Sequence, residues 1–306
     1  MTRLLIVIGG PTASGKSALA VVLAQGIGGV VVNADAMQLY RDLPILTARP
    51  SPEEEVLAPH RLYGLWGASV QGSAGRWLDL VQHVLRDEPN RPLIVVGGTG
   101  LYLHALLHGI AAVPEIDPAV RADVRSIPAQ ALHPLLQQED PALAAILHPT
   151  DPQRLMRGLE VIRATGRSLL AWQSDEPYRI ALGAADMIGI ALIPPRASLV
   201  ARIERRLATM IETGALAELE AFLADPASAS SPLRKAVAVP DLIAHLADGI
   251  PLDTALAAAV ISTRRYAKRQ VTFLRHRLSQ LQQYAAFGDE AALQQEILDM
   301  VRRHVR

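Results

Sequence analysis

The chain has 306 residues, of which 50% are hydrophobic, and its 30 basic and 30 acidic side chains give a formal net charge of zero. A chain of this length and hydrophobicity can bury a sizeable core in one large domain or two, which excludes a disordered protein. The balanced charge leaves only local basic clusters to attract nucleic acid. The absence of cysteine excludes disulfides, thiolate nucleophiles and cysteine-ligated zinc.

The sequence carries no targeting or membrane signal. Its N-terminal apolar run, RLLIVI, is too short for a signal peptide, and no stretch approaches the roughly 20 apolar residues that span a bilayer. We therefore expect a cytoplasmic protein with no membrane partner, and we expect a monomer.

The first third of the chain alternates between strand and helix patterns. Short apolar runs predict strands at 3–8, 28–35 and 92–96, and helical periodicity predicts helices at 14–27 and 101–109. The order strand, glycine-rich loop, helix, strand predicts a parallel sheet with a right-handed crossover.

The pattern changes to helices only at about residue 115. Helical periodicity and Asp-Pro pairs, which suit helix starts, predict an all-helical insertion over 115–181. The apolar run 187–193 predicts a return to the sheet. The predicted fold class is therefore α/β, with a P-loop NTPase-like parallel sheet core formed by 1–114 and 182–306.

Residues 10–17, GPTASGKS, complete the pattern G-x-x-x-x-G-K-[ST] between the first strand and the first helix. Such a loop binds phosphate because successive N–H groups converge at a helix N-terminus, glycine permits close approach, and lysine adds positive charge. The predicted phosphate-binding residues are Gly10, Pro11, Thr12, Ala13, Ser14, Gly15, Lys16 and Ser17.

The loop alone does not identify the phosphate. A kinase or nucleotide hydrolase usually has an acidic residue at a second strand end to hold Mg²⁺, whereas Gly97, Gly98 and Thr99 follow the strand at 92–96. Asp35 follows the second strand instead, and we expect it beside the loop because the carboxyl ends of parallel strands meet at one edge. By its spacing, Asp35 could equally cap the next segment or bind Mg²⁺.

Five segments occur in the order and spacing typical of one family. The chain resembles, over nearly its whole length, the bacterial tRNA dimethylallyltransferases (IPP transferases), which prenylate adenosine 37 beside the anticodon. The matching segments are 10–17, 33–50, 91–109, 148–166 and 262–275.

The resemblance implies a chemistry for the loop. It implies that the loop holds the diphosphate of dimethylallyl diphosphate, and that Asp35 accepts a proton from the weakly nucleophilic adenine N6 as the C–N bond forms. Lys16, the Thr99 hydroxyl and a Mg²⁺ ion near Ser17 would stabilise the departing diphosphate. It also implies that Arg196 and Arg202 extend this clamp, although their spacing alone does not show that they converge.

Two segments are expected to bind the tRNA anticodon stem-loop. No acidic residue lies between Asp253 and Asp289, and i,i+4 pairs on the helix there would present a positive surface to phosphates. The resemblance adds a segment of the insertion and the residues that follow the base, which would handle the flipped adenosine. The expected tRNA-binding residues are Asp35, Ala36, Met37, Gln38, Arg121, Gln153, Arg154, Leu155, Met156, Arg157, Arg264, Arg265, Lys268 and Arg269.

Some positions depart from the family pattern. Leu46 stands where the family usually has glycine, and Ala238-Val239-Pro240 replaces a Gly-Tyr pair. Pro240 removes a backbone donor and Val239 an aromatic surface, so we assign no site residue there.

Three other functions share parts of these motifs: a prenyltransferase acting on free AMP or ATP, a small-molecule kinase, and a tRNA-binding protein without catalysis. Arg154, Arg157 and the insertion argue against the first, because a mononucleotide needs no long basic surface. Intact Lys16, Asp35 and Thr99 argue against the last.

Overall fold

The computed structural model describes residues 3–182 and 185–305. The chain forms two compact units, a core of Met1–Leu107 and Ile180–Arg306 and an insertion of His108–Arg179. The insertion therefore begins earlier than the sequence-based boundary of 115. The reason is an isolated antiparallel bridge in which the backbones of Ile110 and Tyr178 exchange two hydrogen bonds.

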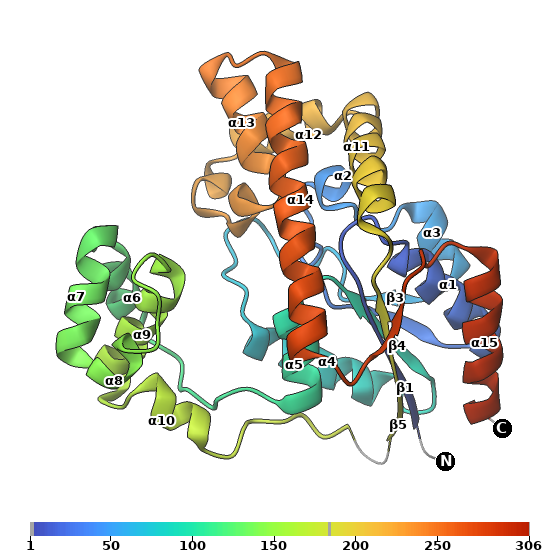
Figure 1. The fold of residues 1–306 in the computed structure, drawn as a ribbon, viewed down its shortest axis with the longest axis horizontal. Helices are drawn as coiled ribbons and strands as arrows, with labels where there is room; N and C mark the ends of the chain where they lie inside the picture. Colours follow the sequence, from blue (N-terminus) through green and yellow to red (C-terminus); the bar gives the residue numbers. More distant parts are fainter. Residues whose placement is uncertain (1–2, 183–184, 306) are drawn as a thin grey trace. The chain divides into compact units, whose positions relative to one another are not determined.

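The core contains a six-stranded, fully parallel sheet in the order β3-β2-β4-β1-β5-β6 (Figure 1). This confirms the predicted α/β class and its parallel sheet. The sequence patterns missed β3 and β6, because strands this short leave no readable run of apolar residues. The strands are β1 (Arg3–Gly9), β2 (Val30–Asn33), β3 (His60–Arg61), β4 (Leu93–Gly97), β5 (Ala185–Leu192) and β6 (Gln282–Tyr284).

Helices cover both faces of the sheet (Figure 1). On one face, α1 (Lys16–Ile27) packs with α15 (Ala291–Val305), and their Leu19, Leu23 and Ile297 join the strands in one buried cluster. On the other face lie α4 (Ala74–Asp87) and α5 (Gly100–His108). Helices thus shield both faces of the sheet from solvent, as is usual for a parallel sheet.

The rest of the core unit is helical and packs beyond the carboxyl ends of the strands. A second buried cluster includes Leu219, Phe222, Val239 and Leu242. The elements are α2 (Pro44–Thr47), α3 (Pro52–Leu57), α11 (Arg196–Glu212), α12 (Ala215–Ala224), two 3₁₀ segments (Pro226–Ser230 and Pro232–Lys235), α13 (Val239–Asp248) and α14 (Leu252–Arg277).

The Ala238–Pro240 segment has a structural explanation. Ala238 caps α13 with φ 70°, in the left-handed region that favours glycine, which accounts for a glycine there in the family pattern. Pro240 lies in the first turn of α13, where no helical N–H partner is lost, and Val239 is completely buried. The segment is therefore a packed helix start, in which the donor missing at Pro240 costs the helix no hydrogen bond.

The insertion has its own core. Leu136, Leu155 and Leu159 are buried together in it. The aspartates of three Asp-Pro pairs each accept a hydrogen bond from a backbone N–H in the first turn of the following helix, which confirms the predicted helix starts. The helices are α6 (Pro118–Arg125), α7 (Ala129–Glu139), α8 (Pro141–Ala144), α9 (Pro152–Thr165) and α10 (Leu169–Ser174).

The independent core of the insertion predicts a local effect of mutation. Leu159→Ala, which empties part of this core, should destabilise the insertion by about 2–5 kcal/mol. Native-state hydrogen exchange should show faster exchange in α7 and α9 and unchanged exchange in β1 and β4. The control Ile146→Ala, at a side chain that is 65% exposed, should have little effect. Equal loss of protection in β4 would contradict two separate units.

Candidate active site

The phosphate loop lies between β1 and α1 and has the geometry of an anion cradle. Ala13 and Gly15 adopt left-handed conformations, with φ 62° and 79°, which turn the backbone around the N-terminus of α1. In the described part of the chain, the N–H groups of Ala13, Gly15, Lys16 and Ser17 donate no hydrogen bond. They are the unpaired donors of a helix N-terminus, and an anion would satisfy them.

A second loop packs directly on the phosphate loop. The Gly288 N–H donates to the Ser14 carbonyl at 2.9 Å. A Cβ on Gly15 would lie 2.8 Å from the Asp289 carboxylate oxygen Oδ1. Glycine is therefore required at position 15 both by its conformation and by this contact.

Lys16 lies inside this cradle and is held by it. Its Nζ donates to the Pro11 carbonyl at 3.4 Å. Burial lowers the pKa of Lys16 to about 8, while the negative charge of Asp35 acts to raise this pKa and the positive charge of Arg206 acts to lower it. The ammonium group is thus poorly solvated, which strengthens its attraction for a phosphate.

Asp35 is fixed immediately after β2. The buried Asn33 side chain accepts from the Asp35 N–H at 2.7 Å and donates to the Asp35 and Leu62 carbonyls at 3.0 and 2.9 Å. Asp35 Oδ1 in turn accepts from the Met37 N–H at 3.0 Å. One carboxylate oxygen therefore caps the following turn, as one interpretation of the sequence had it, while Oδ2 faces Gly98, 3.4 Å from the position of a Cβ there.

The negative charge of Asp35 affects the pKa values of three tyrosines. Burial is the main cause that raises the pKa of Tyr63, Tyr102 and Tyr266, and the negative charge of Asp35 raises each further. The phenols therefore stay protonated at neutral pH. The charge of Asp35 thus acts on three largely buried phenols.

Thr99 joins the end of β4 to the turn after β2. Its Oγ1 accepts from the Ala36 N–H at 2.9 Å, and its own N–H donates to the Ala34 carbonyl at 3.3 Å. Accepting one bond leaves the hydroxyl hydrogen available to donate. The structure thus brings Asp35 and Thr99 together, as the strand order implied.

The arginines of α11 differ from the sequence-based expectation. Arg202 Nη1 bonds both carboxylate oxygens of Asp289 at 2.7 Å, and its guanidinium lies 3.7 Å from the centre of the Phe287 ring. Arg202 thus contacts Asp289, which packs against the phosphate loop, and its expected role in the clamp stays a prediction. Arg196 is exposed at the first residue of α11, on a different face because six residues rotate a helix by roughly 240°.

Sequence reasoning missed Arg206. Burial lowers the pKa of Arg206. The negative charge of Asp35 opposes this shift, so the two side chains attract each other electrostatically. The signal was present in the sequence, because Arg206 follows Arg202 by four residues, next to the buried Ile203 and Leu207.

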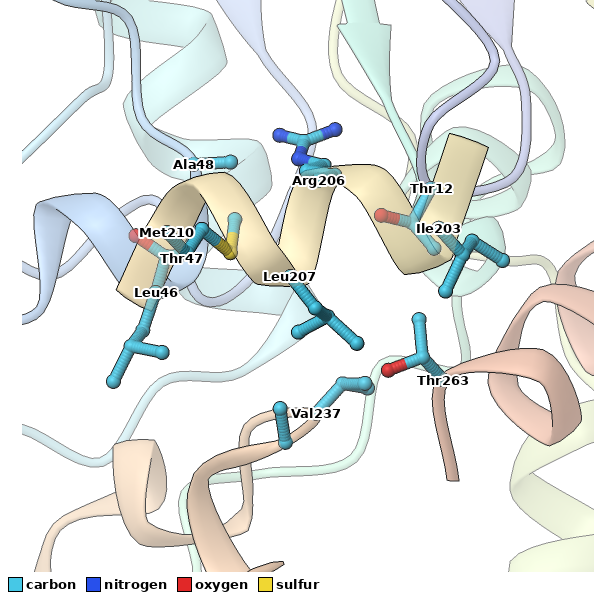
Figure 2. A pocket seen from close by; sticks show the side chains of 11 residues that line it. Thr12, Leu46, Thr47, Ala48, Ile203, Arg206, Leu207, Met210, Val237 and Thr263 are labelled. Atoms are coloured by element: carbon cyan, nitrogen blue, oxygen red, sulfur yellow. The ribbon is translucent and has the colours of Figure 1, made fainter. Parts of the chain in front are cut away.

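A small apolar pocket adjoins the phosphate loop. Leu207 and Ile203 point from α11 toward Thr263 and Val237, and Thr12 of the phosphate loop lies at one end (Figure 2). Its lining residues are Thr12, Leu46, Thr47, Ala48, Ile203, Arg206, Leu207, Met210, Val237, Ala238 and Thr263. The pocket can receive a compact apolar group next to a phosphate.

The four basic side chains of α14 that we expected to bind tRNA are exposed, and none of them is paired with an acidic side chain in the described chain. They are Arg264, Arg265, Lys268 and Arg269. Arg269 lies 5.7 Å from the centre of the Tyr266 ring. This surface is positively charged, as the acid-free sequence predicted.

In the insertion, Gln153 and Arg154 are exposed on α9, whereas Leu155 is completely buried in the insertion core. The Leu155 side chain therefore offers no surface to RNA, and a contact there would have to come from its backbone. Arg157 pairs with the buried Glu160 at 3.8 Å.

Two other expected RNA positions are also partly withdrawn from solvent. Met156 packs partly buried against the core of the insertion. Arg121 lies close enough to Arg157 to lower the pKa of Arg157, although burial is the larger cause.

The residues after Asp35 lie near the site, but the Gln38 side chain is engaged by a neighbouring loop. Ala36 and Met37 are half-buried, and both use their N–H groups in the turn. The Gln38 amide donates to the Thr47 and Ala48 carbonyls at 3.0 and 2.8 Å. Gln38 thus positions the neighbouring loop.

Residues 3–182 and 185–305 contain no group of three or more His, Asp or Glu side chains able to hold a metal ion. They also contain no helix long and apolar enough to cross a membrane.

Comparisons with known proteins agree with one another. Residues 38–277 match the family described as IPP transferase. The tRNA dimethylallyltransferase of Parvibaculum lavamentivorans is 47% identical over 97% of this chain and 95% of its own length. That of Methylobacterium nodulans is 50% identical over 90% of this chain and 92% of its own.

Solved structures show the same fold. The full-length tRNA isopentenylpyrophosphate transferase from Bacillus halodurans superposes with a TM-score of 0.71 and 29% identity, covering 98% of this chain and 96% of that one. A eukaryotic dimethylallyltransferase acting on tRNA superposes with a TM-score of 0.74 and 26% identity, covering 89% of this chain and 70% of its own.

The lowered pKa of Lys16 predicts how anion binding depends on pH. Diphosphate affinity of the wild type, relative to Lys16→Ala, should fall as the pH rises through about 8, because the ammonium group loses its proton there. Calorimetry with inorganic diphosphate should show a roughly tenfold relative loss from about pH 7 to about pH 9. A constant ratio across this range would place Lys16 outside the anion site.

Proposed function

Because the chain belongs to the IPP transferase family, we propose that it transfers a dimethylallyl group from dimethylallyl diphosphate to N6 of adenosine 37 in tRNA and releases diphosphate. The observation that carries this proposal is the meeting of the phosphate loop, Asp35 and Thr99 at the carboxyl ends of β1, β2 and β4. We further propose that the enzyme is monomeric and acts in the cytoplasm.

Asp35 is the general base of the proposed reaction. The adenine N6 lone pair is delocalised into the ring, so removal of its proton as the C–N bond forms lowers the barrier. Asp35 Oδ1 is occupied by the Met37 N–H, which leaves Oδ2 as the proton acceptor.

The phosphate loop holds the leaving group. As the allylic C–O bond breaks, negative charge grows on the diphosphate, and the unpaired loop amides, the Lys16 ammonium and the Thr99 hydroxyl stabilise it. The loop holds the departing diphosphate and not a nucleotide whose phosphate is transferred. The proposed reaction therefore needs no acidic residue of the kind that kinases place after β4.

Mg²⁺ fits this site as a partner of the diphosphate. The exposed Ser17 hydroxyl in the first turn of α1 offers one oxygen ligand. The described residues supply no complete metal-binding cluster, so the other ligands would be diphosphate oxygens and water, which Mg²⁺ commonly retains. When bound, the ion would neutralise part of the charge on the diphosphate.

The apolar pocket beside Thr12 suits the dimethylallyl tail. Ile203, Leu207 and Met210 line it with aliphatic side chains. Removal of the tail from water would favour a prenyl diphosphate over inorganic diphosphate. The pocket thus offers a physical basis for a prenyl donor.

Both units offer basic side chains to RNA. In the core, the exposed face of α14 carries Arg264, Arg265, Lys268 and Arg269; in the insertion, the exposed or half-exposed basic residues are Arg121, Arg154 and Arg157. Lys and Arg side chains of this kind bind phosphates and displace counterions. The flipped adenosine would then meet Asp35 and the residues after it.

One experiment separates the proposed function from its rivals. The protein is incubated with dimethylallyl diphosphate, Mg²⁺ and either unmodified tRNA or free AMP, and the nucleosides are analysed by mass spectrometry. A C5 addition at A37 is expected. Prenylation of AMP alone would favour the mononucleotide enzyme, and phosphoryl transfer from ATP would favour a kinase.

Loss of the base should lower the chemical rate. Asp35→Ala should reduce the single-turnover rate by at least ~10²-fold, the scale of a lost general base, with little change in tRNA affinity. Asp35→Asn keeps an oxygen for the Met37 N–H and should be equally slow, which separates proton transfer from loop folding. An unchanged rate at saturating substrates would remove Asp35 from this role.

Loss of phosphate contacts should act on affinity instead. Replacing Arg265 and Arg269 with alanine should weaken tRNA binding and make it less sensitive to salt, because each lost contact releases nearly one counterion fewer. Prenyl transfer should persist at saturating tRNA. The control replaces Arg302 and Arg303, exposed on α15, and should leave the salt slope unchanged. Identical slopes and affinities for wild type and the α14 variant would refute these contacts.

A further inference from the structure

Gln270 is a buried polar side chain on α14 whose amide bridges two loops of the site. It is only 6% exposed. Its Oε1 accepts from the Thr12 N–H of the phosphate loop at 2.9 Å, and its Nε2 donates to the Gly98 carbonyl at 2.9 Å. The two segments lie 258 and 172 residues away in sequence, so this amide is a long-range crosslink.

The chain is built to let this amide approach. A Cβ on Gly98 would lie 2.2 Å from Gln270 Nε2 and 3.4 Å from Asp35 Oδ2. Any larger residue at position 98 would therefore push the Gln270 amide away. The bridge joins the two loops that carry the proposed phosphate cradle and Thr99.

An amide is chemically suited to this position. It offers an acceptor oxygen and a donor NH₂ group in one plane. The oxygen serves the Thr12 N–H, and the NH₂ group serves the Gly98 carbonyl and the Tyr266 side chain. The Thr12 N–H is committed to Gln270 and the Ser14 N–H to the Pro11 carbonyl, which leaves the N–H groups of Ala13, Gly15, Lys16 and Ser17 unpaired at the start of α1. The bridge thus decides which N–H groups of the loop are available to diphosphate.

We propose that Gln270 is a positioning residue of the transferase: its side-chain amide fixes the diphosphate loop relative to the Gly98–Thr99 loop, and hence the leaving group relative to Asp35. The inference rests on the proposed function. Gln270 acts through Thr12 and Gly98 on the reacting groups. Its loss misplaces the loop while leaving the fold and the exposed basic face of α14 in place.

Gln270→Met removes both hydrogen bonds at similar length. We expect kcat to fall about 10- to 100-fold, the scale of a small misplacement of reacting groups, with KM for tRNA within about threefold of wild type. Affinity for inorganic diphosphate should fall, and hydrogen exchange at the Thr12 N–H should become faster.

The matched control is Ser262→Ala, which also lies on α14 and loses a side-chain bond, from Ser262 to Asp241 at 2.8 Å. This variant should be destabilised to a similar extent as Gln270→Met and keep wild-type kcat. If the two variants lose activity in parallel with their melting temperatures, Gln270 is merely structural and the proposal is overturned.

A carboxylic acid provides a rescue test. In Gln270→Glu, the protonated side chain can accept from Thr12 and donate to Gly98, whereas the carboxylate cannot donate. Activity relative to wild type should therefore rise as the pH falls through the pKa of the introduced acid. A ratio independent of pH would overturn the bridge.

The bridge also predicts that substitutions at Gln270 and Gly98 do not have additive effects on the rate. Gly98→Ala should displace the Gln270 amide, so the double variant with Gln270→Met should be little slower than the slower single variant. Simple multiplication of the two losses would contradict a shared bridge.

The diphosphate affinity and the hydrogen exchange need no prenyl transfer, which separates the inference from the proposed function. If wild type does not modify tRNA, yet Gln270→Met weakens diphosphate binding and loosens Thr12, the function fails and the positioning role stands. If wild type modifies tRNA and Gln270→Met binds diphosphate and turns over as wild type does, the positioning role fails alone.

Discussion

The unpaired N–H groups at the start of α1 are the constraint on which the rest of the site depends. They favour an anion as partner, and the left-handed turns at Ala13 and Gly15 shape the loop that carries them. A parallel sheet then places the ends of β2 and β4 beside that point. One carboxylate and one hydroxyl, Asp35 and Thr99, stand there because the strand order puts them there.

The helices outside the sheet convert this cradle into a transferase site. Helix α11 supplies the apolar pocket and Arg206, and α14 carries basic side chains on its exposed face and Gln270 on its buried face. A nucleotide kinase would use the same loop on ATP, so the proposed difference lies in these surroundings. A half-buried carboxylate beside a small apolar pocket suits alkylation of an amine better than phosphoryl transfer.

The sequence was sufficient to predict most of the sheet and the phosphate loop, because both have clear local patterns. The strands at β1, β2, β4 and β5 have continuous apolar runs, and the phosphate loop has fixed glycines at fixed spacing. Two-residue and three-residue strands have no such pattern. The resemblance supplied the chemical role of Asp35, which its position alone left open between base, cap and metal ligand.

The long-range partners of individual side chains could not be predicted from the sequence. The pairing of Arg202 with Asp289 and the bridge of Gln270 join residues far apart in the chain, which no local periodicity encodes. Burial of Leu155 follows from its place on α9, and a helical-face reading would have found it.

We propose that the amides of the phosphate loop bind a prenyl diphosphate rather than ATP. The decisive measurement is hydrogen exchange of residues 13–17 with dimethylallyl diphosphate, with ATP and without ligand. We expect strong protection by dimethylallyl diphosphate and little by ATP. Protection by ATP alone would show that the loop serves a nucleotide instead.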